Sequence, residues 1–302
     1  MRTSLECLVC FMRQALVAAR LSSQDPEVQR RVMDEVGRLL AALDLDRSAP
    51  ENAVGVYRLI ADITGVRDPY AELRKTSNEF ALGLRDAVRQ QVESAADPLY
   101  TALRFAVAGN IIDYGAGHGF DAAATMAGCL EQKPLIDDFV ALERDLERGP
   151  DILYLADNSG EIVFDGLLIE QLQARGCKVT LAVRGDIILN DVTLRDVKEC
   201  GLDRLCPVIT NGTGCPGTPL DSCSPEFRKR FAGADLIMSK GQGNFETLSE
   251  VAAPIYFLLT VKCSLVARCI AETKGLAPEL VTGDGEIVLM KQVQGRDYCI
   301  IT

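Results

Sequence analysis

The second half of the chain alternates short β-rich runs with helical segments, and this order limits the folds open to it. The strand candidates are rich in branched and aromatic residues and lie at 152–156, 178–183, 205–210, 235–239, 254–261 and 286–290. Helical segments separate several of them, at 160–175, 192–201 and 224–232. Repeated strand–helix–strand order predicts an α/β fold with a mainly parallel sheet and helices on both faces. Ligand sites in such sheets lie beyond the carboxyl ends of the strands.

The first half of the chain reads as helical. Apolar residues recur at spacings of three and four from Val28 through Val36 to Leu43, which gives one apolar helical face. Similar patterns occur at 5–22, 69–94 and 97–112. The sequence pattern changes from helical to alternating β-rich and helical segments at an Arg-Gly-Pro sequence near residue 150. We therefore predict a helical domain over residues 1–147 and an α/β domain over residues 148–302.

The charge of the chain limits its partners. The sequence has 32 Lys and Arg residues against 43 Asp and Glu residues, a net charge of −11. This balance disfavours nonspecific binding to nucleic acid or anionic membranes, because such surfaces need clustered basic residues. The start of the sequence lacks a signal-peptide hydrophobic stretch, and the longest apolar run, near 251–261, is too short to span a bilayer. We expect a soluble, cytoplasmic protein.

The single histidine, His118, excludes a metal site built from several imidazoles, so any metal must bind carboxylates, amides or thiolates. The eleven cysteines are scattered and odd in number, which fits a reduced protein better than a disulfide framework. Cys7 and Cys10 form a CxxC pair without a second pair to complete a zinc site. Buried thiols and a redox or metal pair both remain open interpretations.

Polar residues follow the first two strands of the predicted sheet. Asp157 and Asn158 come after the first strand, and Asp191 follows the second. Each segment also has the composition of a turn and helix cap. The functional interpretation is a site for a hard cation, because carboxylate and amide oxygens suit Mg or Mn. Two neighbouring acids repel each other, and a divalent cation would relieve that repulsion.

Two further segments carry candidate residues. Lys240 ends the fourth strand and is followed by Gly241, a second glycine and Asn244, so this is either a flexible turn or a phosphate-binding loop. The spacing is not that of a Walker A loop. In the helical half, Asn110 and Asp113 share one helical face within an apolar stretch. They form either an interdomain hydrogen-bonded pair or a face that closes over the metal site.

The four segments 108–113, 157–161, 190–193 and 240–246, in this order, resemble the metal-dependent damage-control phosphatases, which contain domain of unknown function 89. The CxxC pair resembles the mainly prokaryotic subgroup that carries one. The resemblance implies a helical domain packed on an α/β domain with a Rossmann-like sheet. It also implies one divalent metal ion (Mg, Mn, Co or Ni) held by Asp157, Asn158 and Asp191.

The same resemblance implies hydrolysis of small phosphate monoesters, namely damaged or side-product phosphometabolites. The expected catalytic residues are Asp157, Glu161 and Lys240. The expected substrate-binding residues are Asn110, Ser159, Lys240, Gly241 and Asn244. Attack by water and a covalent aspartyl-phosphate both remain open.

The same fold is also compatible with two other functions. One is a noncatalytic regulator that binds a metal or a nucleotide. The other is a methyltransferase, which is disfavoured because the segment after the first strand matches a glycine-rich cofactor loop poorly. The sequence makes no prediction about the oligomeric state.

Overall fold

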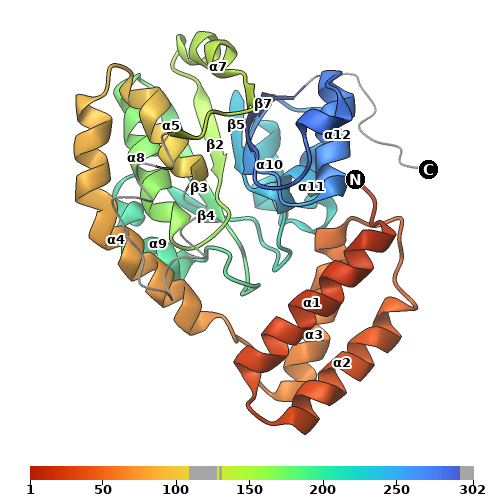
Figure 1. Ribbon diagram of the computed structural model, residues 1–302. Coiled ribbons are helices and arrows are strands. Elements are labelled where there is room, and N and C mark those ends of the chain that lie inside the picture. The colour runs from red at the N-terminus through yellow and green to blue at the C-terminus, as the bar shows by residue number, and fades with distance from the viewer. Residues whose placement is uncertain (109–127, 129–130, 293–302) are drawn as a thin grey trace.

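The computed structural model describes residues 1–108, 128 and 131–292 (Figure 1). Asn110, Asp113 and His118, which the sequence singled out, lie outside the described residues. The described part is a sheet covered by helices on both faces, with a separate bundle of three helices beside it (Figure 1).

The described residues form a seven-stranded sheet with the order β1-β7-β6-β5-β2-β3-β4. Its strands are β1 (Ile136–Asp137), β2 (Asp151–Leu155), β3 (Lys178–Val183), β4 (Val208–Thr210), β5 (Leu236–Lys240), β6 (Ile255–Thr260) and β7 (Ile287–Lys291). Neighbouring strands are parallel except β6 and β7, which are antiparallel. The prediction of an α/β fold with a mainly parallel sheet is therefore confirmed.

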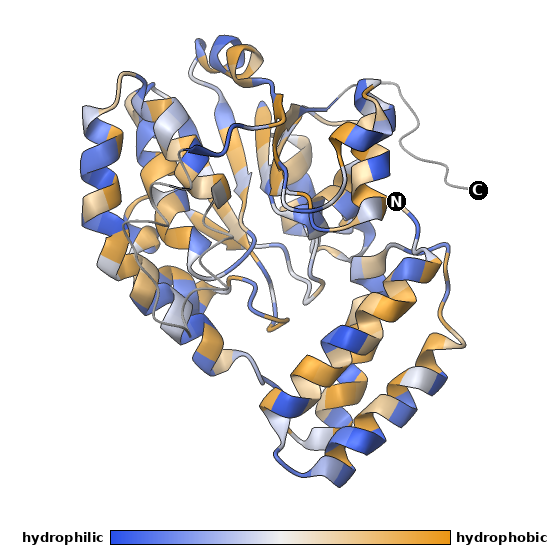
Figure 2. Ribbon diagram, viewed as in Figure 1, coloured by the Kyte–Doolittle hydropathy of each residue, from blue (hydrophilic) through white to orange (hydrophobic). Residues whose placement is uncertain are grey.

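Helices cover both faces of the sheet because its strands alternate their apolar side chains between the two. In β2, Ile152 and Tyr154 pack in one core while Leu153 and Leu155 pack in the other. Hydrophobic residues are frequent along the strands of the sheet (Figure 2). The first core is covered by α4 (Ala71–Ser94), α5 (Pro98–Ala108), α7 (Phe139–Leu146), α8 (Glu161–Ala174) and α9 (Leu194–Cys200). The second is covered by α10 (Pro225–Ala232), α11 (Gln242–Leu248) and α12 (Ser264–Lys274).

The three N-terminal helices have a core of their own. They are α1 (Leu5–Ser22), α2 (Pro26–Leu40) and α3 (Ala49–Thr64). Ala15, Val36 and Val56, one from each helix, are buried together there. The predicted domain boundary after residue 147 stays a prediction, and the cores divide elsewhere, since α4 and α5 share the core of the sheet. No helix in the described part of the chain is long and apolar enough to cross a membrane.

A carboxylate stabilises the turn that leads into β7. Glu286 accepts hydrogen bonds from the backbone N–H groups of Thr282, Gly283 and Asp284 and from the Thr282 hydroxyl. Burial opposes ionisation, but these hydrogen bonds outweigh it and lower the pKa of Glu286 to about 2. A carboxyl group with a lowered pKa stabilises the fold above its unfolded pKa, and this contribution is lost as the pH falls through its folded pKa.

We therefore expect Glu286→Gln to lower the free energy of unfolding at neutral pH by about 1 kcal/mol, a modest value because the carboxylate is partly exposed. Urea denaturation at pH 7 and pH 3 measures this. The difference between parent and variant should be smaller at the lower pH, where the parent carboxylate loses part of its advantage. An equal difference at both values would contradict the assignment.

Candidate active site

The loops that follow β2 and β3 are joined at the carboxyl edge of the sheet. Asn158 and Asp191 form an antiparallel β-bridge. The Ser159 N–H donates to the Asn190 carbonyl at 2.9 Å, and the Val192 N–H donates to the Asp157 carbonyl at 2.9 Å. This backbone pairing places Asp157 and Asn158 beside Asp191, as parallel-strand geometry predicts.

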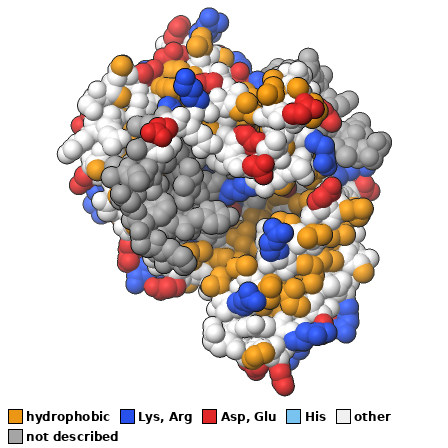
Figure 3. Space-filling view, viewed as in Figure 1, with side chains coloured by type: hydrophobic (Ala, Val, Ile, Leu, Met, Phe, Trp, Pro, Cys, Tyr) orange, Lys and Arg blue, Asp and Glu red, His pale blue; other side chains and the backbone are white. Residues whose placement is uncertain are grey.

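A cleft of about 490 Å³ opens at this edge, between the three-helix bundle and the α/β part. Asp157, Asn158 and Asp191 line it together with Lys262, which follows β6. Its other lining residues include Cys7, Cys10, Phe11 and Gln14 of α1, Ala49, Pro50 and Ala53 of α3, and Gln242 and Glu246 of α11. Hydrophobic side chains gather over α1 in the space-filling view (Figure 3). Leu5, Val9 and Val17 of α1 are exposed.

Arg184, the residue after β3, lies buried beneath the two carboxylates. Its Nε donates to Asp191 Oδ2 at 2.6 Å, and its Nη2 lies 3.4 Å from Asp157 Oδ1. Arg184 is a site residue that was not predicted from the sequence. The available signal was an arginine at a predicted strand end, where ligand sites gather.

The two carboxylates lie in an environment that disfavours their combined negative charge. Burial and the charges of Asp191 and Glu161 raise the pKa of Asp157 well above its usual value, against the opposing effect of Arg184 and Lys262. Burial also raises the pKa of Asp191, and Arg184 only partly offsets this. A further cation between them would therefore be favourable.

The donor chemistry fits a hard divalent ion. Asp157 and Asp191 supply carboxylate oxygens, and Asn158 supplies an amide oxygen while its Nδ2 donates to Asp157 Oδ2 at 2.8 Å and to Glu161 Oε1 at 3.2 Å. Among the described residues, no three His, Cys, Asp or Glu side chains are grouped so that they could hold a metal ion. The set formed by two carboxylates and one amide contains only two side chains of those four types. Metal binding by Asp157, Asn158 and Asp191 is therefore a proposal.

Lys240 lies in the interior, although the sequence analysis assigned it to phosphate. Its Nζ donates to Asp165 Oδ1 at 2.7 Å, to Glu161 Oε2 at 3.0 Å and to the Ala106 carbonyl at 2.6 Å. Burial disfavours the charged lysine, but the two carboxylates raise its pKa above the usual value. The side chain is 1% exposed, and neither it nor Glu161 is among the residues that line the cleft. In the described part of the cleft wall, the lysine is Lys262.

Lys262 is exposed, and its positive charge partly opposes the rise that burial causes in the pKa of Asp157 and of Asp191. Lys262 was not among the residues predicted from the sequence. The signal was again a charged residue at the end of a predicted strand.

The other predicted substrate-binding residues support the framework. Gly241 has a φ of +81°, and a Cβ at this position would lie 2.1 Å from Asp157 Oδ2, so only glycine fits. The Ser159 hydroxyl donates to the Asn190 carbonyl at 3.0 Å. Asn244 is buried, and its Oδ1 accepts from Arg184 Nη1 at 3.0 Å.

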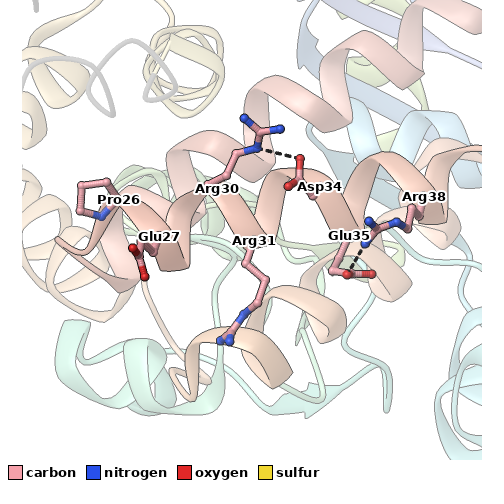
Figure 4. A pocket seen from close by; sticks show the side chains of 7 residues that line it. All are labelled: Pro26, Glu27, Arg30, Arg31, Asp34, Glu35 and Arg38. Atoms are coloured by element: carbon pink, nitrogen blue, oxygen red, sulfur yellow. Dashed lines mark hydrogen bonds and ion pairs between the residues drawn. The ribbon is translucent and has the colours of Figure 1, made fainter.

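Another hollow lined by charged residues runs along α2 (Figure 4). It is lined by Pro26, Glu27, Arg30, Arg31, Asp34, Glu35 and Arg38. Arg30 pairs with Asp34 and Arg38 pairs with Glu35 on the exposed helix surface. Such exposed pairs are typical of a solvated helix face, so this hollow is not a candidate for the site.

The cysteines of the described residues are free thiols. Most are buried, as the sequence analysis expected of a reduced protein, whereas Cys7 and Cys10 line the cleft. Cys7 is half-buried and Cys10 is exposed, so neither is one of the buried thiols.

The model of the damage-control phosphatase ARMT1-like domain matches residues 3–276. The chain is 36% identical to damage-control phosphatase PH1575 of Pyrococcus horikoshii over 279 residues, 91% of this chain and 96% of that protein. It is 34% identical to a damage-control phosphatase of Archaeoglobus fulgidus over 284 residues, 91% of this chain and 97% of that protein.

The structural comparison agrees. The crystal structure of a family protein with domain of unknown function 89 from Pyrococcus horikoshii matches with a TM-score of 0.86 and 32% sequence identity. The match covers 97% of this chain and all of that one. Sequence and fold thus agree over nearly the whole length, and the chain belongs to the damage-control phosphatase family.

Proposed function

We propose that this protein hydrolyses small phosphate monoesters, the class of damaged or side-product phosphometabolites, with one divalent metal ion held by Asp157, Asn158 and Asp191. The observation that carries the proposal is the β-bridge between Asn158 and Asp191, which gathers these oxygen donors on the wall of one cleft. Relatives named damage-control phosphatases support the same reaction class.

A divalent cation at these oxygens would withdraw charge from the phosphoryl group and activate a water molecule. The candidate metals are Mg, Mn, Co and Ni. Lys262 supplies the positive charge at the cleft wall and would bind phosphate oxygens that the metal leaves unpaired. This local positive charge lets a strongly acidic chain bind an anionic substrate.

Asp157 is the carboxylate that we assign to the reaction itself, either as the base that orients water or as the nucleophile. It lines the cleft, whereas Glu161 is committed to Lys240 and Asn158 in the interior. Glu161 and Lys240 would then act by holding Asn158 in place. This revises the sequence-based roles of both residues.

Hydrolysis of an aryl phosphate tests the proposal. We expect activity that requires added Mn or Mg, that disappears with a chelator and that returns when excess metal is restored. Asp191→Asn should remove it as well, because one carboxylate ligand is lost. The same rate with metal, with chelator and in the variant would refute the proposal. Metal binding without turnover of a broad phosphate panel would instead favour the noncatalytic regulator.

A further inference from the structure

The side chain of Arg184 uses all three of its nitrogens within the buried site. Nε and Nη2 point to the carboxylates of Asp191 and Asp157. Nη1 donates to the Gly217 carbonyl at 3.0 Å, to Asn244 Oδ1 at 3.0 Å and to Thr218 Oγ1 at 3.2 Å. The side chain is 3% exposed, so these contacts form away from solvent.

The groups that hold Nη1 are themselves fixed. The Thr218 hydroxyl donates to Asn244 Oδ1 at 2.8 Å, and Asn244 Nδ2 donates to the Lys240 carbonyl at 2.8 Å. A Cβ at Gly217 would lie 2.6 Å from the Gly243 carbonyl oxygen, which shows how closely this loop packs on α11. The guanidinium is thus clamped on one side and presents two N–H groups to the carboxylates on the other.

The backbone pairing after β2 and β3 already joins the two loops. Arg184 is therefore not needed to bring the loops together. What it fixes is the orientation of two carboxylate side chains, through a rigid planar fork that a flexible ammonium does not reproduce. Each carboxylate retains lone pairs for a cation.

We propose that Arg184 is a positioning residue of the metal site, which holds the Asp157 and Asp191 carboxylates in the geometry that receives the ion, and that Asn244 and Thr218 act on the site through it. This inference rests on the proposed function, because it needs the metal site. It assigns Asn244 to support of the site and not to contact with substrate.

A competing role would give the opposite result. If Arg184 only neutralised the carboxylates in place of a metal, removing its charge would tighten metal binding, since one cation would no longer repel another. If it positions them, removal frees both side chains and weakens binding. Loss of groups that orient metal ligands weakens metal binding by about 10- to 100-fold.

The experiment is calorimetric titration of Mn²⁺ into the full chain and three variants. We expect Arg184→Met to weaken Mn²⁺ binding by about tenfold or more, and Arg184→Lys to restore only part of it because the charge returns without the fork. Arg230→Met is the matched control. Arg230 hydrogen-bonds to Asp151 at the start of β2 and to Thr180 within β3, away from the carboxyl ends of both strands, and should leave Mn²⁺ binding unchanged.

The outcomes separate the two proposals. Weaker binding in Arg184→Met, with unfolding midpoints like those of Arg230→Met, supports the positioning role. Equal or tighter Mn²⁺ binding in a folded Arg184→Met variant overturns the positioning role. If Arg184→Met does not fold, Arg184→Lys decides, and a dissociation constant equal to that of the parent overturns the positioning role. A parent chain that binds no Mn²⁺ would overturn the metal site itself, and with it any role of Arg184 there.

Discussion

Replacing Asp157 with Asn should reduce phosphate-ester hydrolysis on the order of 10³-fold or more while leaving the fold at least as stable as in the parent. Activity falls because the substitution removes both a charged metal ligand and the carboxylate assigned to the reaction. Stability is retained because Asn keeps the size of the side chain and an acceptor for Arg184. It also removes one negative charge from beside Asp191 and Glu161, where burial and repulsion raise the pKa of Asp157.

Two measurements are needed, the steady-state rate on an aryl phosphate with saturating metal and the thermal unfolding midpoint. Asp186→Asn is the matched control, because Asp186 lies near the same sheet edge but is exposed and paired with Arg67. It should change neither quantity appreciably. Activity of Asp157→Asn within about tenfold of the parent would show that the reaction does not depend on this carboxylate. A large loss of stability would show that its charge supports the fold.

Much of the fold follows from local patterns. The segment 5–22 and the strand 178–183 match α1 and β3 residue for residue, because each carries a clear periodicity. The helix α3 was not singled out, although Ser48 and Glu51 form a capping box and Gly65 ends the helix with a positive φ. The two-residue β1 had no signal of its own, since it pairs with β7, far along the chain.

The site was harder to predict than the fold. The sheet-edge rule brought Asp157, Asn158 and Asp191 together correctly, because it depends only on strand order. The rule does not predict which lysine and arginine side chains face the cleft and which are buried beneath it. The burial of Lys240 depends on Asp165 and Glu161, four residues apart on the same face of α8. Two acids at that spacing in an apolar helix were the clue to a buried partner.

Replacing each of the two lysines at the sheet edge, Lys240 and Lys262, with Met should change a different property of the protein. Lys240→Met leaves the carboxylates of Glu161 and Asp165 buried without their cation. Removing one partner from such a buried network costs about 3–5 kcal/mol of stability. Lys262→Met removes an exposed charge, so its stability should stay within about 0.5 kcal/mol of the parent. Its effect should appear as a KM for phosphate esters raised about tenfold, because the charge acts on bound phosphate.

Urea denaturation and steady-state kinetics on both variants separate the two roles, and each variant is the control for the other. The contrast follows from where each ammonium finds its partners. Lys240 has three acceptors in the interior, whereas Lys262 lies on the cleft wall near Asp157 and Asp191. If Lys240→Met were as stable as the parent and instead raised KM, the buried network would not hold in solution and Lys240 would have to reach the substrate. If Lys262→Met bound phosphate esters normally, the positive charge for the substrate would not come from the lysine of the described cleft wall.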